Sequence, residues 1–233
     1  MNSKLTPFEH HFSKIAMQFG EKSRALMLWH LSDGRPYTAS ELAFCVDISA
    51  QSASNHLSQL KKMNIIKVEK SGRYKYYKIA NPQVAMVLEN MANLIPDDYD
   101  KSSARKLENE GTKFARTCYD HLAGKLGIDI TSAMIDKGIV RKNRDIFVIT
   151  KQGEIWFSKH GININALKNK KRTLAHKCLD WTEKKYHIGG ALGSAFLEMM
   201  FKNDWIRRKP HSRQVLITAR GKSELLHLLE INL

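Results

Sequence analysis

The 233-residue sequence has few cysteines, few acidic side chains and no long hydrophobic run. Its three cysteines are an odd number in a chain of this length, which favours a reducing cytoplasm and argues against structural disulfides. The first residues, MNSKLTP, lack the apolar core of a secretory signal. The longest nearly apolar stretch, residues 188–201, is too short to span a bilayer and contains Glu198. We therefore expect a cytoplasmic protein with no membrane partner.

The motifs of common enzyme sites are also missing. No glycine-rich phosphate loop follows an expected strand, and neither a His-Glu-x-x-His zinc motif nor a nucleophile elbow occurs. A Gly-x-x-Gly segment at Gly124 and Gly127 is similar to the backbone clamp of one class of RNA-binding domain, but we expect it inside a helix. We predict no catalytic residues, no cofactor and no enzymatic activity.

Acidic residues are scarce relative to basic ones. The chain has 38 Lys and Arg against 23 Asp and Glu, a net charge of +15 and a pI near 9.7. Such a charge favours a polyanionic partner such as nucleic acid and says nothing about the fold. The hydrophobic content of 42% is ordinary, and 233 residues can form one large or two small domains.

Residues 38–62 predict two consecutive helices, of which the second has an unusual polar face. Thr38 and Glu41 form a capping box that starts a short helix ending near residue 46. A second helix begins at Ser49 and places three apolar residues, Ala53, Leu57 and Leu60, on one face. Its other face carries short uncharged side chains that can form hydrogen bonds: Gln51, Ser52, Ser54, Asn55, Ser58 and Gln59. A solvated face usually carries Glu and Lys, so this face indicates a ligand.

A basic β-hairpin is expected directly after the polar helix. Residues 65–70 and 73–79 are typical of two strands joined by Ser71-Gly72. The hairpin carries five cations, Lys67, Lys70, Arg73, Lys75 and Lys78, against one acid, Glu69. Tyr74 and Tyr76 share a face, which we expect to pack on the core. Helix, turn, polar helix and basic hairpin together predict a winged helix-turn-helix that docks on duplex DNA.

Three segments give a more specific resemblance: IS at 48–49, SNHL at 54–57 and LKKMNII at 60–66. They resemble the recognition region of the ArsR family of bacterial repressors over roughly residues 8–95. The family usually has Gly where Asn64 stands, and Asn also tolerates the left-handed turn expected there. The resemblance implies a winged-helix DNA-binding domain that dimerises through its first and last helices.

The helices that flank this region could provide such an interface. Phe8, Phe12, Ile15 and Phe19 form one apolar stripe, which could close the domain's own core or pair with a second subunit. The helix expected over residues 81–94 begins with Asn81-Pro82. Metal-sensing relatives carry a cysteine pair near Cys45 and zinc ligands on the last helix. Here Ala43 replaces one cysteine and the last helix lacks those ligands, so we expect neither metal site.

Residues 96–114 are polar and predict a linker, and residues 115–233 contain an internal repeat. HLAGKLG at 121–127 aligns with HIGGALG at 187–193, and FVITKQG at 147–153 aligns with VLITARG at 215–221. Each copy, 115–165 and 175–233, predicts a helix, a short strand ending in Ile-Thr and a further helix. The fold expected is therefore mainly α with short β-hairpins, with a winged helix-turn-helix at 1–95 and a duplicated, winged-helix-like C-terminal domain.

The C-terminal domain is as basic as the N-terminal one. Residues 1–95 carry a net charge of +5 and residues 96–233 a net charge of +10. The basic runs lie at 141–144, 168–172 and 207–213. They could form a solvated basic surface or could add phosphate contacts beside a DNA site.

Six residues repeat between the two copies and are our candidate effector or redox residues: Cys118, Asp120, His121, Cys178, Asp180 and His187. On a helix, Cys118 and His121 would share a face, an arrangement compatible with a metal ligand pair or a histidine-activated thiol. The alternative is a buried cysteine and a helix-packing corner. We predict no permanently bound metal.

The sequence thus predicts a homodimeric DNA-binding transcriptional regulator, most simply a repressor released by a small-molecule, redox or metal effector. The expected DNA-binding residues are Gln51, Ser52, Ser54, Asn55, Ser58, Lys61, Lys62, Lys70, Arg73 and Lys75. The partners expected are an inverted-repeat DNA operator and a second copy of the chain. Two alternatives are a thiol- or metal-dependent enzyme built on the C-terminal repeats and an RNA-binding module.

Overall fold

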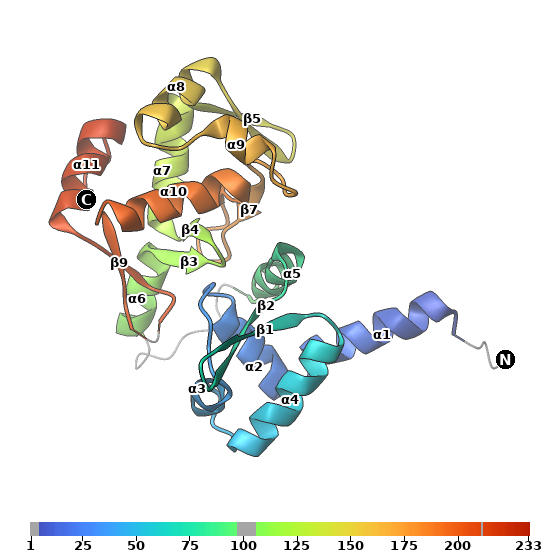
Figure 1. Cartoon of the computed structure of the whole chain (residues 1–233). Helices are drawn as coiled ribbons and strands as arrows, with labels where there is room; N and C mark the ends of the chain where they lie inside the picture. Colours follow the sequence, from blue (N-terminus) through green and yellow to red (C-terminus); the bar gives the residue numbers. More distant parts are fainter. Residues whose placement is uncertain (1–4, 97–105, 211) are drawn as a thin grey trace. The chain divides into compact units, whose positions relative to one another are not determined.

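A computed structural model describes residues 5–96, 106–210 and 212–233, and it divides into two compact units, residues 1–88 and 89–233 (Figure 1). The division falls inside one helix, α5 (Pro82–Ala92). We predicted a linker at 96–114, but α6 (Lys106–Phe114) lies within that range. Its Lys, Glu and Leu residues are good helix formers, and polar composition alone does not separate an exposed helix from a linker. No helix in the described ranges is long and apolar enough to cross a membrane.

The N-terminal unit is a winged helix-turn-helix. It contains α1 (Pro7–Gly20), α2 (Lys22–Leu31), α3 (Ala39–Cys45), α4 (Ala50–Lys62), β1 (Ile66–Ser71), β2 (Tyr74–Ile79) and the first part of α5. The two strands are antiparallel and pair from Ile66↔Ile79 to Ser71↔Tyr74. A further bridge, Tyr37↔Tyr77, joins the segment before α3 to the hairpin. The core consists of fully buried apolar residues from α2, α3 and α4 and from the base of the hairpin: Met27, Leu28, Leu31, Leu42, Leu57, Leu60 and Ile79.

Local signals start the helices of this unit where the sequence predicted. Thr38 and Glu41 form both hydrogen bonds of the capping box at α3. The Ser49 hydroxyl accepts a hydrogen bond from Ser52 N at 3.1 Å and caps α4. Asn64 has φ of 53°, so the left-handed turn between α4 and β1 is confirmed.

The C-terminal unit contains two successive copies of one hairpin–helix–hairpin–helix arrangement. The first is β3 (Arg116–Cys118), β4 (His121–Ala123), α7 (Lys125–Asp136), β5 (Val140–Asn143), β6 (Ile146–Ile149) and α8 (Lys151–Lys159). After α9 (Ile164–Lys168), the second is β7 (Lys177–Leu179), β8 (Tyr186–Ile188), α10 (Gly190–Lys202), β9 (Ile206–Arg208), β10 (Val215–Ile217) and α11 (Ala219–Leu229). All five hairpins of the described chain are two-stranded and antiparallel. The predicted fold class, helical with short hairpins, is confirmed.

The repeated Ile-Thr-x-x-Gly segments explain how the last helix of each copy starts and packs closely against the preceding segment. Thr150 and Thr218 cap α8 and α11 by accepting hydrogen bonds from the N–H groups of Gly153 and Gly221. A Cβ at either glycine would lie 2.0 Å from a backbone oxygen of the segment packed against it. Only glycine allows the helix start to approach that closely, so both copies keep the same residue pair. One apolar core, which includes Ile130, Phe157, Leu192, Phe196 and Leu225, joins the two copies.

Candidate functional site

The polar face of α4 is directed to solvent. Gln51, Ser54, Asn55 and Ser58 are exposed, and Ser52 is partly buried. The opposite face, Ala53, Leu57 and Leu60, has no exposed surface and holds α4 to the core. The Gln51 side-chain amide N–H lies 3.4 Å from Asn55 Oδ1, so the two amides lie side by side on the free face. The helix therefore presents donors and acceptors outward, as a groove-reading helix must.

Arg24 positions α4 and was not identified from the sequence. Its side chain is buried, with 8% of the residue exposed. The guanidinium donates to Gln59 Oε1 on α4 at 3.1 Å and to Met17 O at the end of α1 at 2.9 Å. One buried cation thus links α1, α2 and α4 and holds the side-chain oxygen of Gln59, a residue that itself stays exposed on α4. A single arginine in a helix gives no sequence pattern that would reveal this role.

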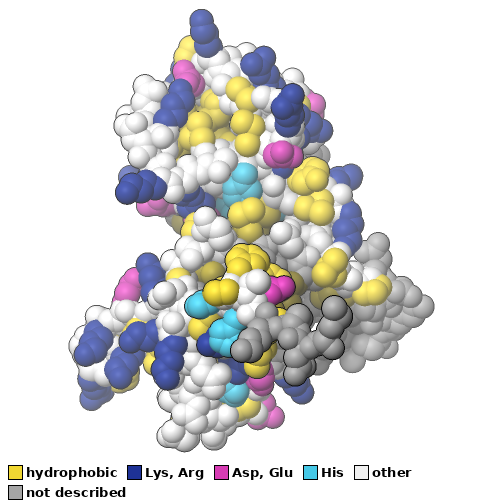
Figure 2. Space-filling view, turned by 90° about the vertical axis from the view of Figure 1, so that its right-hand side faces the viewer, with side chains coloured by type: hydrophobic (Ala, Val, Ile, Leu, Met, Phe, Trp, Pro, Cys, Tyr) yellow, Lys and Arg dark blue, Asp and Glu magenta, His cyan; other side chains and the backbone are white. Residues whose placement is uncertain are grey.

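The hairpin is basic, but its cations are not equivalent. Glu69 pairs with Lys78 at 2.6 Å and with Lys67 at 3.4 Å. No acidic side chain in the described ranges forms an ion pair with the remaining hairpin cations, Lys70, Arg73 and Lys75. Figure 2 shows Lys and Arg side chains, in dark blue, gathered on one side of the N-terminal unit. The hairpin tip therefore provides positive charge that is available for phosphate.

The two tyrosines of the hairpin differ in burial. Tyr76 is partly buried, but Tyr74 is 49% exposed, so the expectation that Tyr74 packs on the core is wrong. Tyr74 lies next to the turn, beyond the reach of the core, and the Arg73 guanidinium lies 5.1 Å from the centre of its ring. The ring supports the arginine at the tip of the hairpin.

The six repeated residues of the C-terminal unit come together, although not on helices as expected. Cys118 and His121 are cross-strand partners in the hairpin β3–β4, and Cys178 and His187 are partners in β7–β8. His121 Nε2 lies 3.1 Å from His187 Nε2, and the two sulfur atoms lie 3.8 Å apart. A turn at 119–120 connects β3 to β4, and the loop at 180–185 connects β7 to β8. Helical spacing could not predict this register. Each copy thus contributes one cysteine and one histidine to a shared cluster.

Both aspartates lie beside these histidines. Asp120 Oδ1 is 3.4 Å from His121 Nδ1, and Asp180 Oδ2 is 3.6 Å from His187 Nδ1. Arg172 binds Asp120 at 2.5 Å, and the fully buried Arg116 binds Asp180 at 2.8 Å. Burial would raise the pKa of Asp120, but hydrogen bonds from His121 and Arg172 lower that pKa to about 2. Both carboxylates are therefore ionised and fixed at neutral pH.

The Cys118 thiol does not have the properties of a reactive site. The neighbouring Cys178 thiol and burial raise the pKa of Cys118 well above its usual value. Only 1% of Cys118 is exposed, so a solvent-borne substrate does not reach it. A catalytic cysteine needs a lowered pKa and access, and this one has neither. Cys45 lies partly buried in α3, in the other unit.

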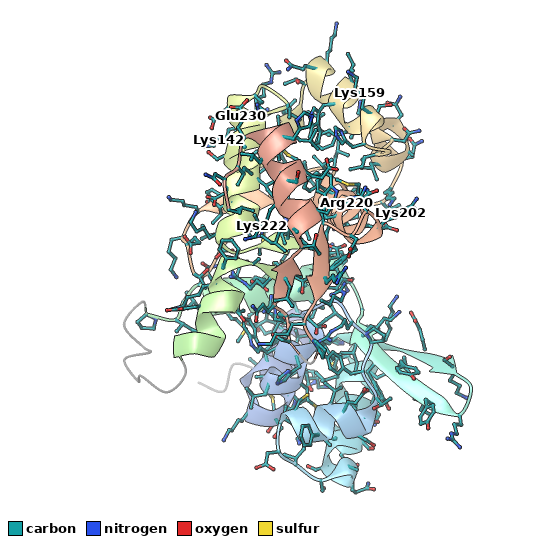
Figure 3. The ribbon with its side chains drawn as sticks, turned by 90° about the vertical axis from the view of Figure 1, so that its left-hand side faces the viewer. Lys142, Lys159, Lys202, Arg220, Lys222 and Glu230 are labelled. Carbon is teal, nitrogen blue, oxygen red and sulfur yellow. The ribbon has the colours of Figure 1, made fainter. Side chains whose placement is uncertain are left out.

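The basic runs of the C-terminal unit are partly used within the fold. Arg172 binds Asp120, Arg207 binds Asp204 at 2.7 Å, and Arg213 binds Glu89. Other cations lie on the surface, and Figure 3 shows the labelled side chains Lys142, Lys159, Lys202, Arg220 and Lys222 extending from the ribbon. Because they are spread over several elements, they favour a solvated basic surface over a focused phosphate site.

Comparisons with known proteins agree with the winged helix. The bacterial regulatory protein family arsR matches residues 21–68. The chain is similar to YdfF of Bacillus subtilis strain 168, an uncharacterized HTH-type transcriptional regulator, with 41% identity over 212 residues, 91% of this chain and 94% of YdfF. Among solved structures, it is similar to HlyU from Vibrio cholerae N16961, with 18% identity, 39% of this chain and 97% of HlyU covered, and a TM-score of 0.35. The winged helix-turn-helix domain of Mb0332 from Mycobacterium bovis gives 18% identity, 39% and 86% coverage, and a TM-score of 0.34. The chain belongs to the ArsR family of bacterial regulatory proteins and is a DNA-binding transcriptional regulator.

Proposed function

We propose that this regulator is a homodimeric repressor that binds an inverted-repeat operator through α4 and the β1–β2 hairpin. One observation carries the proposal: the uncharged face of α4 is exposed beside a hairpin tip whose cations lack acidic partners among the described side chains. An α-helix fits the major groove, and short amides and hydroxyls can read base edges there. The adjacent cations would hold the phosphates that fix the helix in register.

The residue roles follow from exposure and chemistry. Asn55 and Gln51 carry side-chain amides, which can form two hydrogen bonds to adenine, and the exposed serines can bond to several base edges. The proposed base-reading set is Gln51, Ser54, Asn55 and Ser58, with the partly buried Ser52 at its margin. The proposed phosphate-binding set is Lys61, Lys62, Lys70, Arg73 and Lys75, all exposed.

The exposed apolar surface of α1 supports the proposed dimer. None of the residues of this 14-residue helix is buried. Even its phenylalanines are exposed, Phe8 to 77% and Phe12 to 63%. In Figure 1, α1 extends away from the other helices of its unit. Two phenylalanines on one exposed face are costly in water, and a second copy of α1 would cover them. Two α4 helices spaced one duplex turn apart would then read the two halves of an inverted repeat.

The two alternative functions receive less support from the site. An enzyme would need an accessible nucleophile or an open metal position, and Cys118 and both cluster histidines are buried. The Gly-x-x-Gly segment is not an RNA clamp because Gly124 and Gly127 are buried where a Cβ would meet backbone oxygens. An effector or redox role for the six residues of the C-terminal cluster stays a prediction.

The test uses the full chain and a duplex selected from a random pool, compared with a scrambled duplex of the same composition. Asn55→Ala should lower the preference for the selected duplex by about 1–3 kcal/mol per half-site and leave binding to the scrambled duplex unchanged. Asn165→Ala, an exposed amide on α9, is the matched control. An equal loss on both duplexes would remove the base-reading role. In cells, a reporter behind the selected operator should be silenced by the wild type and released by Asn55→Ala, and activation by the wild type would contradict repression.

A further inference from the structure

We propose that Cys118, His121, Cys178 and His187 bind one Zn²⁺ ion, which links the two copies of the C-terminal repeat. The inference concerns the C-terminal unit alone and does not depend on the proposed operator or on the dimer. It replaces our sequence-based prediction of no permanently bound metal, in which Cys118 and His121 were considered as a metal ligand pair on a helix and the four residues were not predicted to meet. Among the described side chains, these four form the one group of three or more potential metal ligands, with all four ligand atoms within 4.8 Å of one another.

The sulfur–sulfur and nitrogen–nitrogen distances of the cluster are close to those of a tetrahedral zinc site, and all four atoms lie within 4.8 Å of one another. With Zn–S bonds of about 2.3 Å, two thiolates at a tetrahedral angle lie about 3.8 Å apart. With Zn–N bonds of about 2.05 Å, two imidazole nitrogens lie about 3.3 Å apart. The observed distances are 3.8 Å between the sulfur atoms and 3.1 Å between the Nε2 atoms. Two cysteines and two histidines are also a common donor set of structural zinc.

The carboxylates provide an independent reason to place a cation between the histidines. Asp120 Oδ1 lies 3.4 Å from His121 Nδ1 and favours the tautomer with the proton on that atom, and the Asp180 carboxylate, 3.6 Å from His187 Nδ1, acts in the same direction through its charge and without a hydrogen bond. Both Nε2 atoms then direct lone pairs at each other across 3.1 Å. Two acceptors at that distance repel unless a proton or a metal ion lies between them. A metal ion removes the repulsion and uses the two sulfur atoms as well.

The fold brings the two halves of the site together by close packing at two equivalent glycines. A Cβ on Gly193 of α10 would lie 2.9 Å from His121 Cβ, and one on Gly127 of α7 would lie 3.8 Å from His187 Cβ. Each helix thus packs against the histidine of the other copy. The repeated His-x-x-Gly-x-x-Gly segment therefore supplies one ligand and makes room for the other one.

Four protein ligands fill the coordination sphere, which identifies the role of the ion. Catalytic zinc keeps one position for water or substrate, whereas structural zinc has four protein ligands. Cys118, His121 and His187 are at most 4% exposed, so solvent access is limited on most sides. A disulfide is the competing use of the two cysteines, but their sulfur atoms are 3.8 Å apart and a disulfide requires about 2.05 Å. The site is suited to hold two repeats together.

The experiment measures bound metal in the full chain. Untagged protein is purified under reducing conditions from cells grown with zinc and dialysed against metal-free buffer. Its metal content is then measured by inductively coupled plasma mass spectrometry. We expect one zinc per chain in the wild type and in two controls, Cys45→Ser in the other unit and His227→Gln on the surface. Cys178→Ser and His187→Gln should lose the bound zinc, and circular dichroism reports whether they are folded.

A second measurement keeps the test decisive if those variants do not fold. Wild-type protein grown with Co²⁺ in place of zinc should show the visible absorption of tetrahedral cobalt and a thiolate-to-cobalt charge-transfer band. A folded wild type that contains no zinc and gives no such band would overturn the proposal. So would a Cys118–Cys178 disulfide found by mass spectrometry in protein isolated without reductant from cells supplied with zinc. Zinc lost equally from the Cys45→Ser control would also overturn it.

Discussion

Replacing Arg73 by alanine tests how the hairpin contacts DNA. Arg73 is exposed at the tip of the β1–β2 hairpin, where it stacks on Tyr74 and has no acidic partner in the described ranges. If it binds a phosphate, it displaces a condensed counterion, and its loss should reduce the salt dependence of binding on every DNA sequence. The fold should not change, because the Arg73 side chain is exposed and lies over the ring of Tyr74, which is exposed as well.

The structure sets the size of this effect. Each phosphate contact contributes about 0.9 to the slope of log K against log salt concentration. The proposed set of Lys61, Lys62, Lys70, Arg73 and Lys75 would give a dimer a slope of about −9 if every cation bound a phosphate. Arg73→Ala removes one cation from each subunit and should shift the slope by about 1.8, toward −7.

The assay is fluorescence anisotropy of labelled duplexes at several salt concentrations, with the selected and scrambled DNA measured in parallel. Arg220→Ala removes the same charge from α11 in the C-terminal unit and is the matched control (Figure 3). Glu69→Gln should increase the slope because it releases Lys67 and Lys78 from their ion pairs. If Arg73→Ala weakened binding without changing the slope, or if Arg220→Ala changed it equally, the phosphate role would be refuted.

Three further predictions concern assembly and the C-terminal unit. Phe12→Glu should convert the dimer to a monomer in sedimentation velocity, whereas Phe44→Glu, which alters an 89% exposed phenylalanine on α3, should leave the dimer intact. Arg116→Ala leaves a fully buried aspartate without its cation and should destabilise the C-terminal unit by about 3–5 kcal/mol in urea unfolding followed by tryptophan fluorescence, and a loss below 1 kcal/mol would contradict this. Gly193→Ala places a Cβ 2.3 Å from a backbone oxygen and should cost about 1–3 kcal/mol, while Gly20→Ala, with no atom within 4 Å, should cost nothing measurable in thermal unfolding.

The N-terminal unit could be predicted from sequence because its signals are local. The Thr38 cap, the apolar stripe of α4 and the turn at Asn64 each depend on residues only a few positions apart. Arg24 could not be predicted, because its partners lie on α1 and α4 and only the packed helices bring them within reach. The prediction that Tyr74 packs on the core was wrong. Strand alternation shows which face of the hairpin a residue lies on, but not how far that residue is from the core.

For the C-terminal unit, the sequence predicted the internal repeat but not the hairpins that hold the cysteines and histidines. The repeat was visible because equivalent residues recur along the chain, but the first hairpin of each copy was not. Strands of three residues, such as β3 and β4, are too short to show alternation. We therefore placed Cys118 and His121 on a helix, where their side chains would share a face. In the hairpin they are paired across two strands instead. The second copy of the repeat completes the cluster, with Cys178 lying 60 positions after Cys118 in the same chain.

Neither copy of the repeat could form this site alone, because both the ligands and the supporting charges come from the two copies. One copy supplies one sulfur and one nitrogen ligand, and two ligands do not complete the coordination of zinc. The supporting ion pair of the second copy's aspartate also crosses between copies: Arg116 precedes His121 in the first copy and binds Asp180 of the second. Its guanidinium also lies 4.6 Å from the ring of Trp181, beside the second hairpin. A change at Arg116 should therefore loosen the position of His187 through Asp180 and weaken metal binding, although Arg116 is not a ligand. Zinc that stayed as tightly bound in Arg116→Ala as in the wild type would show that the ligands alone hold the site.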